Sequence, residues 1–226
     1  GQSCGYLFEG ERLVGDHLTI FSRATPGAIN DAPSVWPRVK DTKFSVDRGF
    51  YQKPFKVEVR SATEGAEIRY TLDGSPPSPQ EGLIYEAPIL IESTSILRVM
   101  AWKENHLSTD IDTASYIFPS QVMRQPAHPE GWPTHYEAKV NPFFARIAGK
   151  DSIDEEGVIV KYAMASPESL DAQPEELERA LLALPSISIV TDKKHFFDSR
   201  TGIHVKPEGR GQKWERPVSV ELIDPQ

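Results

Sequence analysis

Apolar and polar residues alternate through much of the segment 42–118. Phe55, Val57 and Val59 are separated by charged residues, and the same two-residue period returns at 68–72. This period places one side of a β-strand against a core and the other side in water. The pattern therefore predicts half-buried strands rather than helices in this segment.

Three further short strands are expected at 89–91, 96–102 and 114–118, and the middle one carries Leu97 and Val99 on a single face. Five or six short strands follow one another at intervals of about ten residues, with turn formers between them and no helical period. This spacing predicts an immunoglobulin-like antiparallel β-sandwich, and hence a mainly β chain.

The segments on either side of the sandwich lack this alternation. Residues 1–41 hold clusters of turn formers, which indicate the tail of a preceding domain and a linker. Residues 119–172 are rich in proline and aromatic residues. We expect them to form an irregular connector that packs through its aromatic side chains, because a long loop without such packing is unusual in a compact domain.

Residues 173–226 are expected to form a small α+β unit. Pro174 stands at a favourable first helical position, and leucines recur every three or four residues until Pro185 ends the pattern. Strand patterns follow at 187–190 and 218–222. Because the sequence ends directly after the last strand, we expect this unit to be incomplete.

The charge and hydropathy of the chain exclude some partners. The net charge of −8 makes nucleic acid an unfavourable partner, and a mean hydropathy of −0.42 argues against a membrane span. The single cysteine, Cys4, cannot form an internal disulfide and leaves the redox compartment open.

Candidate catalytic and metal-binding groups are few. Asp110 and Asp112 stand two apart beside the expected last strand, where we expect both to be solvated surface acids. The six histidines never occur at the spacing of a metal site. We therefore expect no catalytic residue, no metal and no cofactor.

Exposed aromatic rings are the groups that a sugar-binding site uses. Trp102, Tyr85 and Trp132 are the candidate glycan contacts, because the first closes a strand and the others fall in loops. The alternative for each is structural packing, since large aromatic rings supply much of the burial in a small sandwich.

Three segments of the sandwich resemble the C-terminal-type module of chitobiase and β-hexosaminidase. They are FSVDRGFY at 44–51, IRYTLDGSPP at 68–77 and LRVMAWK at 97–103. The resemblance covers about a third of the chain. It implies an immunoglobulin-like module that carries no catalytic role.

Both flanks resemble further families. ATPGAIN at 24–30 is similar to the closing segment of a lamin-tail-type domain, and 184–192, 197–203 and 214–222 resemble the opening part of a CotH-type kinase domain. This order implies a large secreted bacterial protein. It also implies that 173–226 lacks the lysine-bearing strands and the acidic Mg²⁺ ligands of such kinases.

The leading hypothesis is a non-catalytic binding or spacer module of a bacterial surface protein with weak glycan affinity. The expected partners are cell-surface polysaccharide or other surface proteins, in an extracellular or cell-surface location. One alternative is an N-terminal fragment of a CotH-like secreted kinase. Another is a structural subunit of a surface layer or filament, built through exposed sheet edges. The oligomeric state stays open.

Overall fold

The computed structural model describes residues 36–136, 153–154, 157–164 and 166–225, together with four short strands near the N-terminus. These strands are β1 (Ser3–Gly5), β2 (Phe8–Glu9), β3 (Arg12–Leu13) and β4 (Thr19–Phe21). β1 pairs with β4, and β2 with β3. Most of the expected tail and linker at 1–41 lies outside the described residues.

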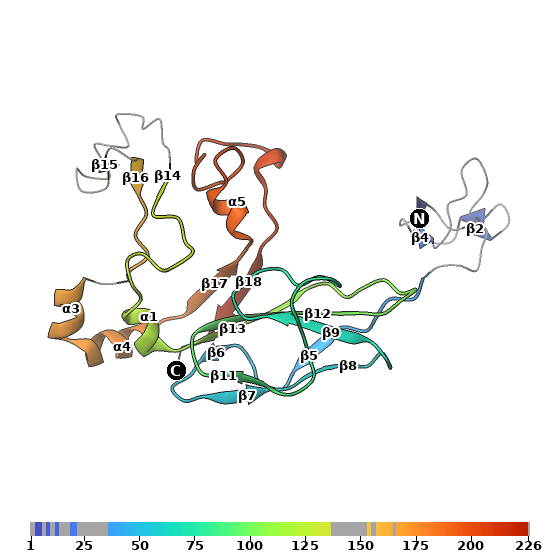
Figure 1. The fold of residues 1–226 in the computed structure, drawn as a ribbon, viewed down its shortest axis with the longest axis horizontal. Coiled ribbons are helices and arrows are strands. Elements are labelled where there is room, and N and C mark those ends of the chain that lie inside the picture. Colours follow the sequence, from blue (N-terminus) through green and yellow to red (C-terminus); the bar gives the residue numbers. More distant parts are fainter. Residues whose placement is uncertain are drawn as a thin grey trace.

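One layer of the sandwich is a five-stranded sheet in the order β10-β9-β12-β13-β6 (Figure 1). Its strands are β6 (Gly49–Phe50), β9 (Glu67–Thr71), β10 (Leu83–Ile84), β12 (Ser95–Trp102) and β13 (Asp112–Ile117). All pairs are antiparallel except β13 with β6, which is parallel.

The facing layer consists of β5 (Thr42–Phe44) paired with β8 (Val59–Ser61), and β7 (Phe55–Val57) paired with β11 (Ile89–Ile91). Glu58 alone separates β7 from β8. Its carbonyl accepts a 2.9 Å hydrogen bond from the Ser45 backbone N–H, and its own N–H donates to Ser45 Oγ at 2.8 Å. The serine thus keeps this layer bonded where the strand ladder is interrupted.

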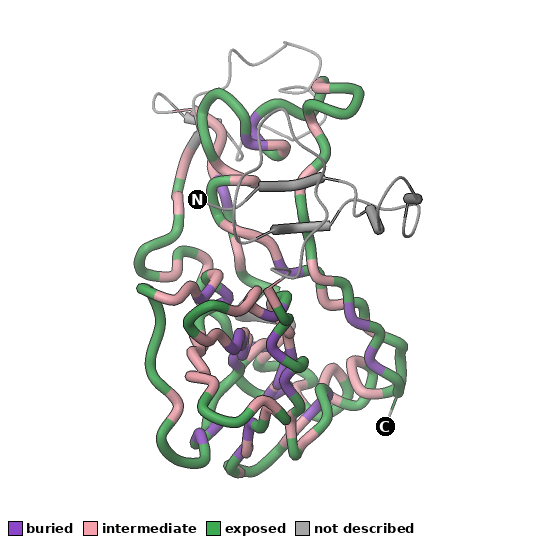
Figure 2. The backbone as a smooth tube through the Cα atoms, turned by 90° about the vertical axis from the view of Figure 1, so that its right-hand side faces the viewer, coloured by how far each residue is buried: buried purple, intermediate pink, exposed green. Residues whose placement is uncertain are grey.

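The predicted alternation defines the core between the two layers. The buried cluster consists of Val57, Val59, Ile89, Ile91, Leu97, Val99, Ala114, Tyr116 and Phe118. Figure 2 shows such buried stretches gathered in the sandwich. Ile68, Tyr70 and Leu72 pack against this cluster as expected. The prediction of a mainly β, immunoglobulin-like sandwich is confirmed.

Short elements make up much of the rest. They are α1 (Pro119–Met123), β14 (His135–Tyr136), β15 (Ile153–Asp154), β16 (Gly157–Ile159), α3 (Pro167–Ala172), α4 (Pro174–Ala183), α5 (Lys193–Phe197) and the 3₁₀ turn η2 (Gln212–Trp214). α4 begins at Pro174 and ends before Pro185, where the sequence predicts it. β16 joins β14 and β15 in a three-stranded sheet.

The last two strands form a separate ribbon. β17 (Ser186–Val190) pairs antiparallel with β18 (Ser219–Ile223). In Figure 1 this ribbon starts beside β13 of the sandwich and rises away from it toward α5. We call this pair of strands the ribbon. Where it meets the sandwich is the polar region described next.

Candidate functional site

The ribbon meets β13 through polar side chains. Thr113 Oγ1 donates to Ser219 Oγ at 2.9 Å, and Ser115 Oγ donates to Glu221 Oε2 at 2.6 Å. Ser115 Oγ also lies 2.6 Å from Ser188 Oγ. We call these five residues the seam. They join parts of the chain that are 73 to 106 residues apart.

The direction of the hydrogen bonds in the seam follows from the number of protons. Ser115 has one hydroxyl proton, and the Glu221 carboxylate can only accept. Because Ser115 uses that proton in its hydrogen bond to the Glu221 carboxylate, the Ser188 hydroxyl must donate in the hydrogen bond between the two serines. Ser115 is fully buried and Glu221 is 6% exposed. Breaking one bond of this buried hydrogen-bond network would leave polar groups without partners, which costs free energy. The network therefore favours the one position of the ribbon in which all its bonds are made.

Arg48 closes one end of the seam. Its Nε donates to the backbone carbonyl of Leu222 at 3.1 Å and lies 3.9 Å from Glu221 Oε1. That carboxylate oxygen is buried and has no hydrogen-bond partner among the described residues. The guanidinium therefore acts on it by charge rather than by a hydrogen bond.

Two tyrosines hold the loop that carries Arg48. Tyr116 Oη donates to the Val46 carbonyl at 2.9 Å, and Tyr51 Oη donates to the Asp47 carbonyl at 2.6 Å. Burial raises the pKa of Tyr116, and burial followed by the nearby Asp47 charge raises the pKa of Tyr51. Both hydroxyls thus stay protonated and able to donate across the ordinary pH range.

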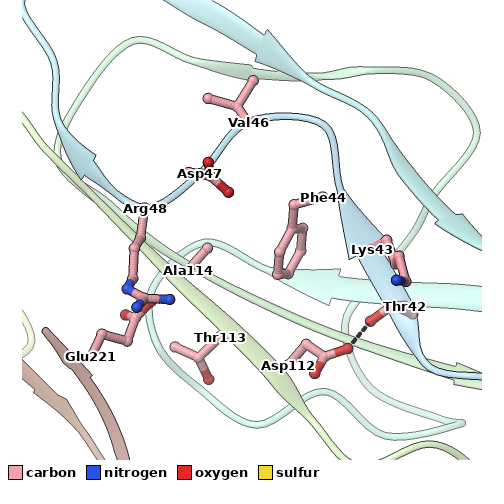
Figure 3. Close-up of a pocket in the computed structure, with 10 residues that line it drawn as sticks. All are labelled: Thr42, Lys43, Phe44, Val46, Asp47, Arg48, Asp112, Thr113, Ala114 and Glu221. Carbon is pink, nitrogen blue, oxygen red and sulfur yellow. Dashed lines mark hydrogen bonds and ion pairs between the residues drawn. The ribbon is translucent and has the colours of Figure 1, made fainter. Parts of the chain in front are cut away.

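A pocket of about 410 Å³ lies between this loop, the start of β13 and the ribbon (Figure 3). It is lined by Thr42, Lys43, Phe44, Val46, Asp47, Arg48, Asp112, Thr113, Ala114 and Glu221. Figure 3 shows the hydrogen bond from Thr42 to Asp112 on one side and Arg48 beside Glu221 on another.

The chemistry of the pocket is polar but not that of a metal site. Its lining residues include three acids, two basic residues, two threonines and one phenylalanine. Within the described part of the chain, no group of three histidine, cysteine or acidic side chains could hold a metal ion. Carboxylate, guanidinium and hydroxyl groups are suited to a neutral, hydroxyl-rich ligand.

The pocket corrects one expectation about the paired acids. Asp110 is a surface acid as expected, with 97% of its side chain exposed. Asp112, however, is half-buried at the first position of β13 and accepts a hydrogen bond from the Thr42 hydroxyl. It differs from the prediction because β13 begins two residues earlier than the apolar pattern indicates, which brings Asp112 alongside β5.

Two of the candidate glycan contacts are engaged in the sandwich. Tyr85 packs against the core cluster, and its hydroxyl accepts the Val59 backbone N–H at 3.2 Å. Trp102 is half-buried, and its indole N–H donates to Glu67 Oε1 at 3.0 Å. Hydrogen bonds from Trp102 and then Arg69 lower the pKa of Glu67.

The third candidate lies in the connector. Trp132 is 39% exposed, and its ring meets those of Tyr162 and Phe197 edge-on at centroid distances of 5.2 and 6.2 Å. Lys193 Nζ lies 4.6 Å from the centre of the Trp132 ring. The connector here packs through its aromatic residue, as expected. Tyr85, Trp102 and Trp132 each have their own neighbours and form no common platform.

The seam itself was missed from the sequence. Ser115, Ser188 and Ser219 give no signal in a hydrophobic pattern, because serine is common on any strand surface. The isoleucine and valine residues of the ribbon predict its two strands. The polar residues between them give no indication of what they contact. One sequence signal was available: Glu221 stands alone between apolar neighbours in a strand pattern.

No helix in the described residues is long and apolar enough to cross a bilayer. Neither a curated protein nor a solved structure matches the chain. One protein-family model does match, within the sandwich, and it confirms the resemblance noted for that part of the sequence. The segment 46–113 is similar to the chitobiase/β-hexosaminidase C-terminal domain.

Proposed function

We propose that this chain is a non-catalytic, carbohydrate-associated module of an extracytoplasmic bacterial surface protein, and that its sandwich holds the C-terminal unit in a fixed position. The observation that carries this proposal is the seam. Ser115 and Thr113 of the sandwich bond to ribbon residues that lie 73 to 106 positions away in sequence. A spacer that positions another unit needs such directional bonds, whereas a flexible tether does not.

The burial of the contact supports a fixed position of the ribbon on the sandwich. The bonds of the seam lie between side chains that are half or fully buried. Val190, at the end of β17, comes close to the turn at Gly74, where a Cβ atom would lie 3.7 Å from its methyl group. The ribbon is therefore held at two points along its length.

The tumbling of the two parts in solution tests this role. Backbone ¹⁵N relaxation should give one rotational correlation time for strands β12 and β13 and for strands β17 and β18. A shorter time for the ribbon than for the sandwich would show that the two move independently, and the proposed role would then be wrong.

A second candidate function is weak glycan binding. The pocket of Figure 3 is a better candidate site for it than Tyr85, Trp102 and Trp132, which lie apart from one another. The pocket brings carboxylates, Arg48 and the Phe44 ring to one surface. Chito-oligosaccharides titrated into the ¹⁵N-labelled chain should shift the amides of 42–48 and 112–114. Asp112→Asn should weaken this binding, while Asp110→Asn, two residues away and outside the pocket, should not.

Insoluble chitin, cellulose and peptidoglycan provide a broader test of the same function. If none of them retains the chain, and the oligosaccharides leave the amide spectrum unchanged, only the positioning role remains.

The kinase-fragment alternative makes a different prediction. The resemblance of 173–226 to the opening of a CotH-type domain is its motivation. Because the positioning role requires no nucleotide, calorimetric titration with ATP and Mg²⁺ should give no binding up to about 1 mM. Binding at roughly micromolar affinity would refute the non-catalytic proposal.

A further inference from the structure

Large apolar side chains cover the outer face of the ribbon. Ile187 and Ile189 of β17 are 64% and 60% exposed, and Val220 and Leu222 of β18 are 62% and 55% exposed. The register pairs Ile187 with Leu222 and Ile189 with Val220, so these four form a block across both strands. Val218 is 48% exposed and extends the block along the chain. We call these five residues the ribbon face.

The orientation of the ribbon is the reverse of an ordinary amphipathic sheet. The side that faces the sandwich carries the polar Ser188, Ser219 and Glu221, with the buried Val190 and Ile223 at its ends. The side that faces solvent carries the exposed apolar side chains Ile187, Ile189, Val220 and Leu222. A shift of one residue would bury the apolar side but break every bond of the seam. The seam therefore fixes the apolar side outward.

The size of the ribbon face fits a protein interface. Each of these side chains exposes roughly 100 Å², which gives about 500 Å² for one copy and about 1,000 Å² for a pair of copies. A contiguous apolar patch of this size is as large as the largest patch on a typical monomer, and such patches are often functional. It also reaches the lower bound, about 1,000 Å² in total, for a specific association.

We propose that two copies of this chain associate by packing their ribbon faces against each other. The four central residues lie on antiparallel strands as two cross-strand pairs, so the block has an approximate two-fold axis of its own. Because all five side chains of the ribbon face are apolar, the same patch on a second copy is chemically complementary to it, as the isologous interface of a symmetric dimer requires. None of the five side chains is charged or polar, so the face carries no group that would select a different partner.

The association goes beyond the proposed positioning role and does not depend on it. The net charge of −8 makes two copies repel. Added salt screens this repulsion and leaves apolar contact intact. The dimer should therefore tighten as the ionic strength rises, whereas an association through ion pairs would weaken.

Analytical ultracentrifugation from about 1 to 500 μM tests the proposal. The chain should dimerise with a micromolar dissociation constant, and Ile189→Asp should raise that constant at least about tenfold. Leu90→Asp is the matched control, because Leu90 is also 50% exposed on a strand but lies in the sandwich. It should leave the dissociation constant unchanged. Circular dichroism confirms that both variants are folded.

Mixing of charged variants gives an independent readout. Ile189→Lys should be monomeric alone, and an equal mixture with Ile189→Asp should form a mixed dimer, because the interface then holds two opposite charges in place of two like charges. The proposal is overturned by a chain that stays monomeric at all concentrations and salt levels. It is overturned equally by a dimer that Leu90→Asp weakens as much as Ile189→Asp, or by folded variants that fail to associate on mixing.

Discussion

Ser115 Oγ donates a 2.6 Å hydrogen bond to the carboxylate of Glu221, which stands 106 residues further along the chain. Both side chains are buried. Ser188 lies at 2.6 Å on the other side of the same hydroxyl. One serine of the sandwich thereby bonds to both strands of the ribbon, and its loss should affect the ribbon more than the sandwich.

Ser115→Ala removes both of these bonds and leaves a buried carboxylate without its donor. Loss of a hydrogen bond to a buried charged group costs about 1.5–3 kcal/mol. We expect hydrogen exchange to accelerate in β17 and β18 while the amides of β9 and β12 keep their protection. Mass spectrometry of exchange on peptic fragments measures both regions at once.

The control for this substitution is Ser120→Ala, at an exposed position of α1. It should leave exchange unchanged in both regions. Equal acceleration in the ribbon and in the sandwich by Ser115→Ala would mean that the seam supports the whole fold and not the position of the ribbon.

The core of the sandwich should be sensitive to a loss of volume. Leu97 is fully buried between the two layers, and Leu97→Ala should lower the free energy of unfolding by about 2–5 kcal/mol. Leu90→Ala, at a half-exposed position, should cost less than about 1 kcal/mol. Urea unfolding followed by circular dichroism compares the two, and similar costs would contradict the assigned core.

Two glycines with positive φ should respond differently to alanine. Gly82 has φ +98°, and a Cβ atom there would lie 2.9 Å from the Tyr70 carbonyl oxygen, whereas Gly131 has φ +74° and open space around it. Both alanine variants should carry backbone strain of about 1 kcal/mol. Only Gly82→Ala adds a backbone clash, so its melting temperature should fall further. A larger fall for Gly131→Ala would contradict the geometry.

Acid should weaken the sandwich through Glu67. Hydrogen bonds from Trp102 and Arg69 lower its pKa from the ordinary value of 4.5. A depressed carboxyl pKa contributes stability that is present above pH 4.5 and is lost as the pH falls through the folded-state value. Wild type should therefore exceed Glu67→Gln in urea midpoint at pH 7, and the difference should shrink near pH 3. A difference independent of pH would show that the carboxylate charge plays no part.

The strands of the sandwich could be predicted because their burial repeats every second residue. Val57, Val59, Leu97 and Val99 carry that period and are all buried. The ribbon was predicted as two strands, but not which side faces the protein. Its apolar residues recur at every second position, and this strand pattern by itself predicts that they face a core. The polar seam reverses that assignment, because bonds to Ser115 depend on a residue far away in the sequence.

The candidate site also depends on contacts between distant segments that the sequence pattern does not predict. Asp112 was expected in solvent because sequence spacing does not place β5 next to it, and the pocket exists only once these strands meet. The aromatic chemistry of Trp102 and Tyr85 predicts glycan contacts. Their hydrogen bonds to Glu67 and Val59 depend on strand pairing that no local pattern predicts.

A ribbon and a neighbouring unit that the sandwich holds in one position should lie at one fixed distance from it. Gln52 and Ser199 are exposed, one in the sandwich and one after α5. Spin labels on cysteines at these two positions, with Cys4 replaced by serine, report the distance between the two parts by double electron–electron resonance. We predict one narrow distance distribution, which broadens in Ser115→Ala. A broad distribution without that substitution, in a chain whose circular dichroism is unchanged, would contradict the account.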